Sequence, residues 1–542
     1  MKTKEHVLAG ACGGLLLLGA GLQSAQAEEA AAAVTGAEKV EQAQAKEQAS
    51  QAQTSAVTIA LIQLLIKEGV ISLDKAQALL AAAEREAAVA QQRAAPPAPS
   101  TVRVTYVPET VKKEMAAELH KDIVEQAKTE RWGVPGTLPE WLDRIELGGD
   151  FRLRLDSAFM GGDNFPYYPD LQAINDAGGV STLDVPVKYL QNTTEDRERM
   201  RYRARLNFNA KVTPGVKVGI SLASGEDNGP VSTNKTFGDY ERKDPVWIDR
   251  AFLEAQLGGG FTFIGGRMPN PFYSTDMLWD TDINPEGAAV KYAHNFGEGR
   301  AAGLFVNAGA FPLLESARNY DRWLYAGQVG ATAPIGKTDF KLGIAYYDFD
   351  NMQSKLDPPD GSKLNDYTRP TLMAQGNSVF NIRTDGLTTL VGLASQYRIL
   401  DVLAQLDVPL GDGKVVRFIA DYVHNFGMDI NQIRRLQGEQ AIAPGDTGWQ
   451  IKISAGDRKI ADKGDWDASL AYKHIETDAV LDVFADSDFG VYGGTDLKGF
   501  VLEGNYGIAR NLWAGFKWLS ADPIERPPFA SDVVLIDLNA RF

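Results

Sequence analysis

From residue 144 to the end of the chain, apolar and polar residues alternate. In residues 145–155 every second position is apolar or glycine, and most of the intervening positions are charged, including Arg152 and Arg154. Successive side chains of a β-strand point to opposite faces. The pattern therefore predicts a strand with one apolar face and one charged face.

The next such segment repeats the alternation more regularly. Residues 200–212 place Met, Tyr, Ala, Leu, Phe, Ala and Val on one face. The opposite face carries Arg199, Arg201, Arg203 and Arg205. Further segments with the same period are 216–222, 340–346, 400–408, 416–422, 466–472, 500–506, 512–518 and 534–542. This recurrence predicts a large antiparallel sheet.

The connections between the predicted strands alternate in length. Short turns are expected at 213–215, 258–260, 294–299, 334–337, 409–413, 457–463 and 508–510. Longer, more polar connections are expected at 157–196, 225–245, 269–286, 312–321, 350–387, 426–447, 478–497 and 520–531. This alternation implies sixteen strands. Residues 388–408 fit one strand or two, so 14 or 18 strands stay open.

Two all-β folds produce such alternation, a soluble β-sandwich and a transmembrane antiparallel β-barrel. The apolar faces extend over about ten residues, which suffices for a tilted strand to cross a bilayer. Short turns at one end and long loops at the other are typical of outer-membrane barrels. We therefore expect residues 144–542 to form a barrel, preceded by a helical periplasmic segment.

The first 27 residues have the features of a secretory signal peptide. Lys2 and Lys4 precede an uncharged run over 7–22, and Ala25-Gln26-Ala27 is a small-x-small cleavage site. A transmembrane anchor is the alternative, but the run is short for a bilayer span. The segment therefore predicts export from the cytoplasm.

Residues 28–143 are predicted to form a separate periplasmic region. Residues 57–92 have apolar residues at helical spacing and suggest a helical hairpin, with Ser72 in the position of an N-cap. The Ala-Ala-Pro-Pro-Ala-Pro stretch at 94–99 is a stiff linker. The apolar stripe over 108–131 is typical of packing or of self-association as a coiled coil.

The last predicted strand ends on Phe542, after apolar residues at 534, 536, 538 and 540. This ending resembles the C-terminal signal of bacterial outer-membrane proteins that the barrel-assembly machinery reads. An ordinary last strand is the alternative.

Several stretches resemble the putative porin family of Gram-negative outer membranes. They are the helical segment before Ala94-Ala95-Pro96-Pro97, Val104-Thr105-Tyr106-Val107-Pro108, the run 139–144 with 149–154, Gly266-Arg267-Met268-Pro269-Asn270-Pro271-Phe272, Trp279-Asp280 and Asn284-Pro285-Glu286-Gly287. The resemblance covers most of the chain after residue 27. It implies a pore, and it assigns no substrate and no binding residue.

The polar faces of the first two strands suggest where such a pore is charged. Sixteen strands enclose an aqueous channel, and rings of charge set its selectivity. The proposed pore-lining residues are Arg152, Arg154, Arg199, Arg201, Arg203 and Arg205. The proposed constriction loop, 269–286, offers Asp276, Asp280, Asp282 and Glu286. The alternative is a structural network of these arginines with Glu146, Asp150 and Glu254, with the loop outside the lumen.

Composition and motifs limit the other function classes. The net charge of −16 argues against nucleic acid as a main partner, and the single Cys12 excludes a disulfide scaffold. Gly336-Lys337-Thr338 lacks the first glycine of a phosphate loop, and Pro285 occupies the glycine position of a calcium loop starting at Asp280. We expect no enzyme, cofactor or metal site, although a Ser–His pair assembled only by the fold stays open.

Two functions fit this sequence. The first is an outer-membrane porin, a water-filled channel for passive diffusion of ions and small hydrophilic solutes. The second is a structural anchor whose residues 28–131 tether or oligomerise in the periplasm. The expected partners are outer-membrane lipid, the barrel-assembly machinery and the solutes. A homotrimer is common among pores of this size.

Overall fold

The computed structural model describes residues 144–542, except 184, 227–228, 318 and 439–442. The predicted signal peptide (1–27) and the predicted helical region (28–143) lie outside the described residues. In the described part of the chain, no helix is both long enough and apolar enough to cross a membrane.

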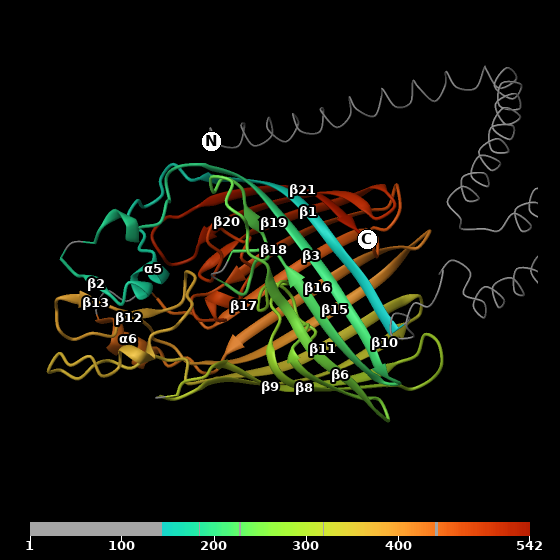
Figure 1. Cartoon of the computed structure of the whole chain (residues 1–542), viewed down its shortest axis with the longest axis horizontal. Coiled ribbons are helices and arrows are strands. Elements are labelled where there is room, and N and C mark those ends of the chain that lie inside the picture. Colours follow the sequence, from blue (N-terminus) through green and yellow to red (C-terminus); the bar gives the residue numbers. More distant parts are fainter. Residues whose placement is uncertain (1–143, 184, 227–228, 318, 439–442) are drawn as a thin grey trace, which may run out of the picture. The chain divides into compact units, whose positions relative to one another are not determined.

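Sixteen long antiparallel strands form one closed sheet within the described residues (Figure 1). Each strand pairs with its neighbours in the chain, and β1 closes the barrel by pairing with both β3 and the last strand, β21. The long strands are β1 (Ile145–Met160), β3 (Arg197–Thr213), β4 (Val216–Ala223), β6 (Trp247–Gly258), β7 (Phe261–Arg267), β8 (Glu286–Asn295), β9 (Gly303–Leu314), β10 (Arg322–Ile335), β11 (Thr338–Asp350), β15 (Tyr397–Gly411), β16 (Lys414–Asn425), β17 (Thr447–Asp457), β18 (Trp466–Ile475), β19 (Leu497–Ala509), β20 (Leu512–Pro523) and β21 (Ser531–Arg541).

These bounds confirm most of the predicted alternation of short and long connections, but the turns at 296–302 and 458–465 are at least as long as the loops at 315–321 and 524–530. The short turns gather at one end of the barrel, the turn end, and the long loops at the other, the loop end (Figure 1). The open question at 388–408 is settled in favour of one barrel strand. Residues 388–393 belong instead to two short strands within a long loop, and the barrel strand begins at Tyr397.

Short elements lie within the long loops. The helices are α5 (Leu171–Asp176), α6 (Ile430–Gln437), η2 (Val187–Tyr189), η3 (Asp366–Thr368) and η5 (Asp482–Phe484), and the short strands are β2 (Val180–Ser181), β5 (Lys235–Thr236), β12 (Val379–Asn381), β13 (Thr388–Thr389) and β14 (Val391–Leu393). Both α-helices begin with an aspartate whose carboxylate accepts backbone N–H groups of the first turn, which satisfies donors that the helix itself leaves free.

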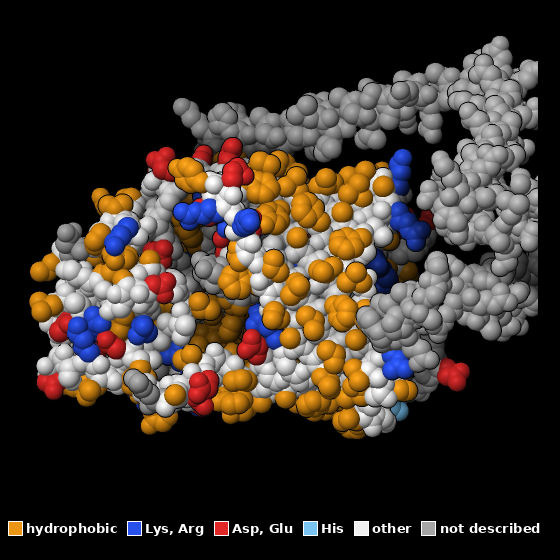
Figure 2. Space-filling model, viewed as in Figure 1, with side chains coloured by type: hydrophobic (Ala, Val, Ile, Leu, Met, Phe, Trp, Pro, Cys, Tyr) orange, Lys and Arg blue, Asp and Glu red, His pale blue; other side chains and the backbone are white. Residues whose placement is uncertain are grey.

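The apolar faces of the strands point away from the lumen. Leu147, Phe151 and Leu155 are 67%, 45% and 46% exposed on β1, and the residues between them are more enclosed. Figure 2 shows hydrophobic side chains spread over the barrel wall, with charged groups concentrated towards its two ends. Such a band surrounding a closed sheet suits a bilayer, because closure leaves no unpaired backbone edge in the lipid.

Phe542 lies at the closure of the barrel. Its backbone N–H donates to the Gly149 carbonyl at 3.1 Å, and its carbonyl accepts the Gly149 N–H at 3.0 Å. A Cβ at Gly149 would lie 2.5 Å from the Phe542 ring, so glycine leaves the room that the ring occupies. The terminal residue thus extends the pairing between β21 and β1.

The lumen contains an apolar core of its own. The loop between β7 and β8 carries Met277, Leu278 and Trp279, which are at most 4% exposed. They belong to the same buried cluster as Tyr347 and Phe349 of β11. The Trp279 ring stacks on Phe349 at 6.2 Å between centroids. These contacts fix the loop against the inner wall.

Candidate pore site

The inner faces of β1 and β3 form an arginine wall, which we define as Arg152, Arg154, Arg199, Arg201, Arg203 and Arg205. The pairing register sets Arg152 opposite Arg203 and Arg154 opposite Arg201. Like charges at directly opposed positions destabilise a sheet, so this wall requires carboxylates.

Two aspartates of β1 supply the first of these carboxylates. Asp150 accepts from Arg203 and Arg205 at 2.9 Å each. Asp156 accepts from Arg199 at 2.8 Å and from Arg201 at 3.3 Å. The inner face of β1 therefore has an aspartate at each end of its arginine pair, and each aspartate bridges two arginines of β3.

Arg154 is paired with carboxylates from elsewhere. Its Nε donates to Asp537 of β21 at 2.8 Å, and its Nη1 contacts Asp488 at 3.1 Å. Asp488 belongs to the loop between β18 and β19, so this loop enters the lumen. Charge-assisted contacts of this kind are stronger than neutral hydrogen bonds, and Arg154 is held by two of them.

Arg152 differs from the other members of the wall. Its guanidinium donates to the side-chain oxygen of Asn234 at 2.6 Å, and it has no ion pair within the described residues. It lines the charged cavity of the lumen that is described below. Arg152 is therefore the member of the arginine wall that lines this cavity without a carboxylate partner among the described residues.

The loop between β7 and β8 crosses the lumen towards the opposite strands. The Tyr273 hydroxyl lies 3.0 Å from the Gln405 side chain of β15, and the Thr275 hydroxyl donates to Asp421 of β16. At its far end Asp282 lies 3.8 Å from Arg203 and 3.5 Å from Arg205. The loop predicted as a constriction thus lies inside the barrel, with Asp282 on the arginine wall.

The loop between β18 and β19 also enters the lumen and contacts the first loop. The Asp486 N–H donates to the Asp276 carbonyl at 3.0 Å, and the Ser487 N–H donates to the Asp280 carboxylate at 2.9 Å. Lys473 of β18 lies between the two loops, 3.0 Å from Asp276 and 2.6 Å from Asp486. The two loops therefore share a buried lysine.

Sequence reasoning missed this second loop. Residues 478–497 were expected only as a long connection, and Asp486 and Asp488 were not singled out. The signal was present, because the stretch Ala-Val-Leu-Asp-Val-Phe-Ala-Asp-Ser-Asp-Phe at 479–489 mixes large apolar residues with aspartates. A loop exposed to water rarely contains so many large apolar side chains, because burying them is favourable. In this loop several of them are buried in the lumen.

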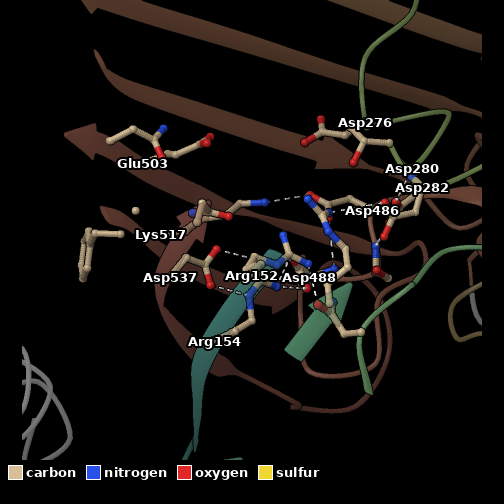
Figure 3. Close-up of a pocket in the computed structure, with 18 of the residues that line it drawn as sticks. Arg152, Arg154, Asp276, Asp280, Asp282, Asp486, Asp488, Glu503, Lys517 and Asp537 are labelled. Atoms are coloured by element: carbon tan, nitrogen blue, oxygen red, sulfur yellow. Dashed lines mark hydrogen bonds and ion pairs between the residues drawn. The ribbon is translucent and has the colours of Figure 1, made fainter. Parts of the chain in front are cut away.

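A cavity of about 370 Å³ lies where the two loops face the wall. In Figure 3, Asp276, Asp280 and Asp282 lie on one side of it, and Arg152 and Arg154 lie on another. Lys452 and Lys517 contribute further cations from β17 and β20. Asp486, Asp488, Glu503 and Asp537 also line the cavity, so carboxylates lie beside these cations as well as across from them.

Burial and neighbouring charge act differently on the loop carboxyls. Burial and then the nearby Asp486 raise the pKa of Asp280 to about 7. Burial also acts to raise the pKa of Asp276, but Lys473 and Lys517 outweigh it and hold the pKa well below its ordinary value. Asp276 is therefore a fixed anion, whereas the charge of Asp280 changes near neutral pH.

Three predicted acidic residues lie away from this cavity. Glu286 begins β8, is exposed, and pairs with Arg267 at 2.8 Å rather than lying in the loop that enters the lumen. Glu146 and Glu254 contact Lys211 and Lys217, at 2.8 Å and 3.0 Å. Of the structural network considered as an alternative, only Asp150 contacts the arginine wall.

A closed antiparallel barrel with an apolar outer band and charged loops in its lumen defines an outer-membrane channel. Residues 55–542 match the model of the family described as "Putative porin". The chain belongs to this family, and it is a porin of the outer membrane.

Solved structures of outer-membrane proteins resemble the chain at low sequence identity. The outer membrane channel DcaP of Acinetobacter baumannii is 13% identical, with a TM-score of 0.38, over 73% of this chain and 97% of that one. OprB of Pseudomonas putida, in its high pH structure, is 10% identical, with a TM-score of 0.44, over 74% and 96%. OmpF of Salmonella typhi, in complex with daunomycin, is 8% identical, with a TM-score of 0.38, over 73% and 97%. A comparison with curated proteins finds no significant match.

Proposed function

We propose that this porin passes ions and small hydrophilic solutes by passive diffusion through the cavity between the arginine wall and the two inward loops. The observation that carries the proposal is the placement of Arg152, which faces this cavity while the loop aspartates lie across from it. Charges fixed on opposite sides of a narrow passage produce a transverse field, and such a field orients polar solutes.

The inward loops support a restricted passage rather than a wide one. They contact β3, β15, β16 and β18 from inside the barrel. Sixteen strands alone would enclose a broad aqueous channel. The loops therefore place charged groups where a permeating solute has little room to avoid them.

Ion selectivity in planar bilayers tests this proposal. In the variant Arg152→Glu we expect the reversal potential under a salt gradient to move towards cation selectivity. The permeability ratio of cation to anion should change on the order of three- to tenfold, because a charge beside a narrow path acts over a few ångströms. Arg398→Glu is the matched control, since Arg398 is half exposed and pairs with Asp348 outside this cavity. Unchanged selectivity in Arg152→Glu would overturn the proposed path.

A paired substitution extends the test to the wall itself. Arg201→Glu combined with Arg203→Glu reverses two charges that face the lumen. If the wall borders the conduction path, conductance and selectivity both change. Retention of both properties in a folded double variant shows that ions pass elsewhere.

We also propose that the porin assembles as a homotrimer, with its N-terminal region in the periplasm, and that the barrel-assembly machinery recognises the strand ending at Phe542. The placement of Phe542 at the closure between β21 and β1 supports the last point. Phe542→Ala should lower the yield of barrel in the outer membrane. Equal yields of the variant and the parent protein would overturn recognition through this residue, and cross-linking in membranes tests the trimer.

A further inference from the structure

A second cavity, of about 520 Å³, lies at the turn end of the lumen, beside the first residues of the β7–β8 loop. We call it the turn-side chamber. It is lined by segments of β7, β8, β9, β10 and β11 and by residues 270–273 of the loop. Its only charged lining residues among those described are Lys291 and Lys341. The chamber therefore has cations on its wall and no carboxylate.

The pairing register explains why these lysines stay unpaired. Lys291 lies between Thr262 on β7 and Asn307 on β9. Lys341 lies between Thr332 on β10 and Gln405 on β15. All four neighbours are neutral. In the described residues, neither lysine has a carboxylate oxygen within ion-pair distance, whereas Lys217, Lys452 and Lys473 on other strands each have at least one.

Two carboxylates on β11 and β15, the strands that carry and adjoin Lys341, are paired with arginines. Asp407 of β15 accepts from Arg417 at 2.7 Å and from Arg458 at 2.6 Å. Asp339 of β11 accepts from Arg300 at 2.6 Å. The cations Lys291 and Arg417 repel Lys341. The positive charge of the chamber thus remains without a counter-charge from the wall.

Aromatic rings adjoin these cations. The Lys341 ammonium lies 3.5 Å from the centroid of the Tyr273 ring and 5.2 Å from that of Phe305. The two rings meet edge to face at 6.3 Å. Pro271 and Phe272 add apolar surface to the lining. The chamber therefore presents apolar faces beside its ammonium groups, with the hydroxyls of Thr262 and Thr332 on the wall.

We propose that the turn-side chamber is a binding site for small organic carboxylates. The ammonium groups of Lys291 and Lys341 attract the carboxylate, threonine hydroxyls on the wall donate to it, and the rings of Tyr273 and Phe305 contact the carbon part. Contact between a charged acceptor and ammonium donors is favourable where water is restricted. This inference rests on the proposed function, because a solute reaches the chamber through the lumen.

Block of single-channel current by benzoate tests the site. Benzoate combines a carboxylate with a flat apolar ring, and benzyl alcohol is a neutral molecule of similar shape. We expect benzoate, and not benzyl alcohol, to interrupt the potassium chloride current of the parent protein. In Lys291→Gln combined with Lys341→Gln, the half-blocking concentration should rise on the order of tenfold, because both charge-assisted contacts are lost.

The matched control is Lys211→Gln combined with Lys217→Gln. It removes the same number of positive charges from the turn end of the wall, but both lysines are paired with glutamates and neither lines the chamber. We expect its half-blocking concentration to stay within about twofold of the parent value, since only distant, screened charge is altered. Equal effects of the two double variants would overturn a specific site and leave only a general effect of charge.

Inorganic phosphate tests whether the aromatic rings contribute to binding in addition to the two lysines. If phosphate blocks the parent protein as well as benzoate does, the rings contribute nothing and the proposal of an organic carboxylate is overturned. A channel that conducts but is not blocked by benzoate overturns the site while the proposed function stands. If the parent protein does not conduct, the proposed function fails, and calorimetric titration of benzoate into the detergent-solubilised barrel decides the site separately, with the same two double variants.

Discussion

Two walls of this lumen carry cations in contrasting ways. On β1 and β3 the arginines lie against carboxylates, with Asp150 and Asp156 each bridging two of them. On β8 and β11 the lysines Lys291 and Lys341 face neutral neighbours. The denser positive wall is therefore largely neutralised, and the sparser one keeps its charge. The charge that a wall carries and the charge that it offers to a solute are different quantities.

The largest effect should come from removing a carboxylate from the arginine wall. Asp156 is 2% exposed and serves both Arg199 and Arg201. Asp156→Asn leaves two enclosed guanidinium groups without their counter-charge, which typically costs about 3–5 kcal/mol of unfolding free energy. Urea unfolding of the folded barrel in detergent measures it. Glu146→Gln, which breaks the exposed pair with Lys211, is the control and should leave the unfolding midpoint unchanged.

The next effect concerns the acidic loops and depends on pH. The pKa of Asp280, about 7 in the folded protein, lies above its ordinary value of 3.8. Between these values the folded barrel keeps a proton that the unfolded chain has released, so stability falls as the pH rises through this window. The unfolding free energy of the parent protein should therefore fall between about pH 5 and about pH 8. In Asp280→Asn this fall should be smaller by on the order of 2 kcal/mol.

Unfolding curves at both pH values measure this change. Asp163→Asn, in an exposed stretch of the β1–β3 loop, is the control and should retain the full pH dependence. An Asp280→Asn barrel with the same pH dependence as the parent protein would show that another group carries the effect.

A smaller effect is expected where the constriction loop meets the arginine wall. Asp282 lies 3.8 Å and 3.5 Å from Arg203 and Arg205, and it accepts hydrogen bonds from Thr233. Asp282→Asn keeps an acceptor for Thr233 and removes only the charge, so we expect a loss of about 1 kcal/mol in unfolding free energy. The same variant should shift selectivity towards anions in bilayers. A shift towards cations would contradict the placement of Asp282 beside the passage.

The smallest effect is expected on the lysine wall. Lys341→Gln removes a cation–π contact with Tyr273, worth about 0.5–1 kcal/mol, but it also relieves repulsion by Lys291 and Arg417. The two changes oppose each other, so the unfolding midpoint should stay close to that of the parent protein. A destabilisation comparable to that of Asp156→Asn would remove the contrast between the walls, because it would give Lys341 a structural role.

Much of the barrel could be predicted from local pattern. Alternation along 145–155 and 199–212 assigned the lipid face and the lumen face correctly, because a strand has a period of two wherever it lies in a sheet. The lengths of the connections gave the strand number. The segment 388–408 could not be divided from its sequence, since the short strands β13 and β14 show the same composition as a barrel strand.

The candidate site was predictable only in part. The arginine wall and the loop acids Asp276, Asp280 and Asp282 were singled out by charge, and the fold brings Asp282 to Arg203 and Arg205. Two partners were not predictable from the sequence, Asp488, which contacts Arg154, and Lys473, which contacts Asp276. In each pair the two residues are more than 180 positions apart in the chain. The local pattern of side chains carries no information on contacts between segments so far apart in the chain.

The sequence by itself determined the barrel, its outer apolar band and the excess of arginine on two neighbouring strands, because these follow from side-chain alternation and from which strands are adjacent in the chain. The tertiary structure alone decided which of those charges are neutralised. Pairing register placed Asp150 and Asp156 among the arginines and left Lys291 and Lys341 beside neutral residues. The inward loops then brought carboxylates to Arg154 and Arg203, because apolar residues such as Trp279 bury best against the inner wall.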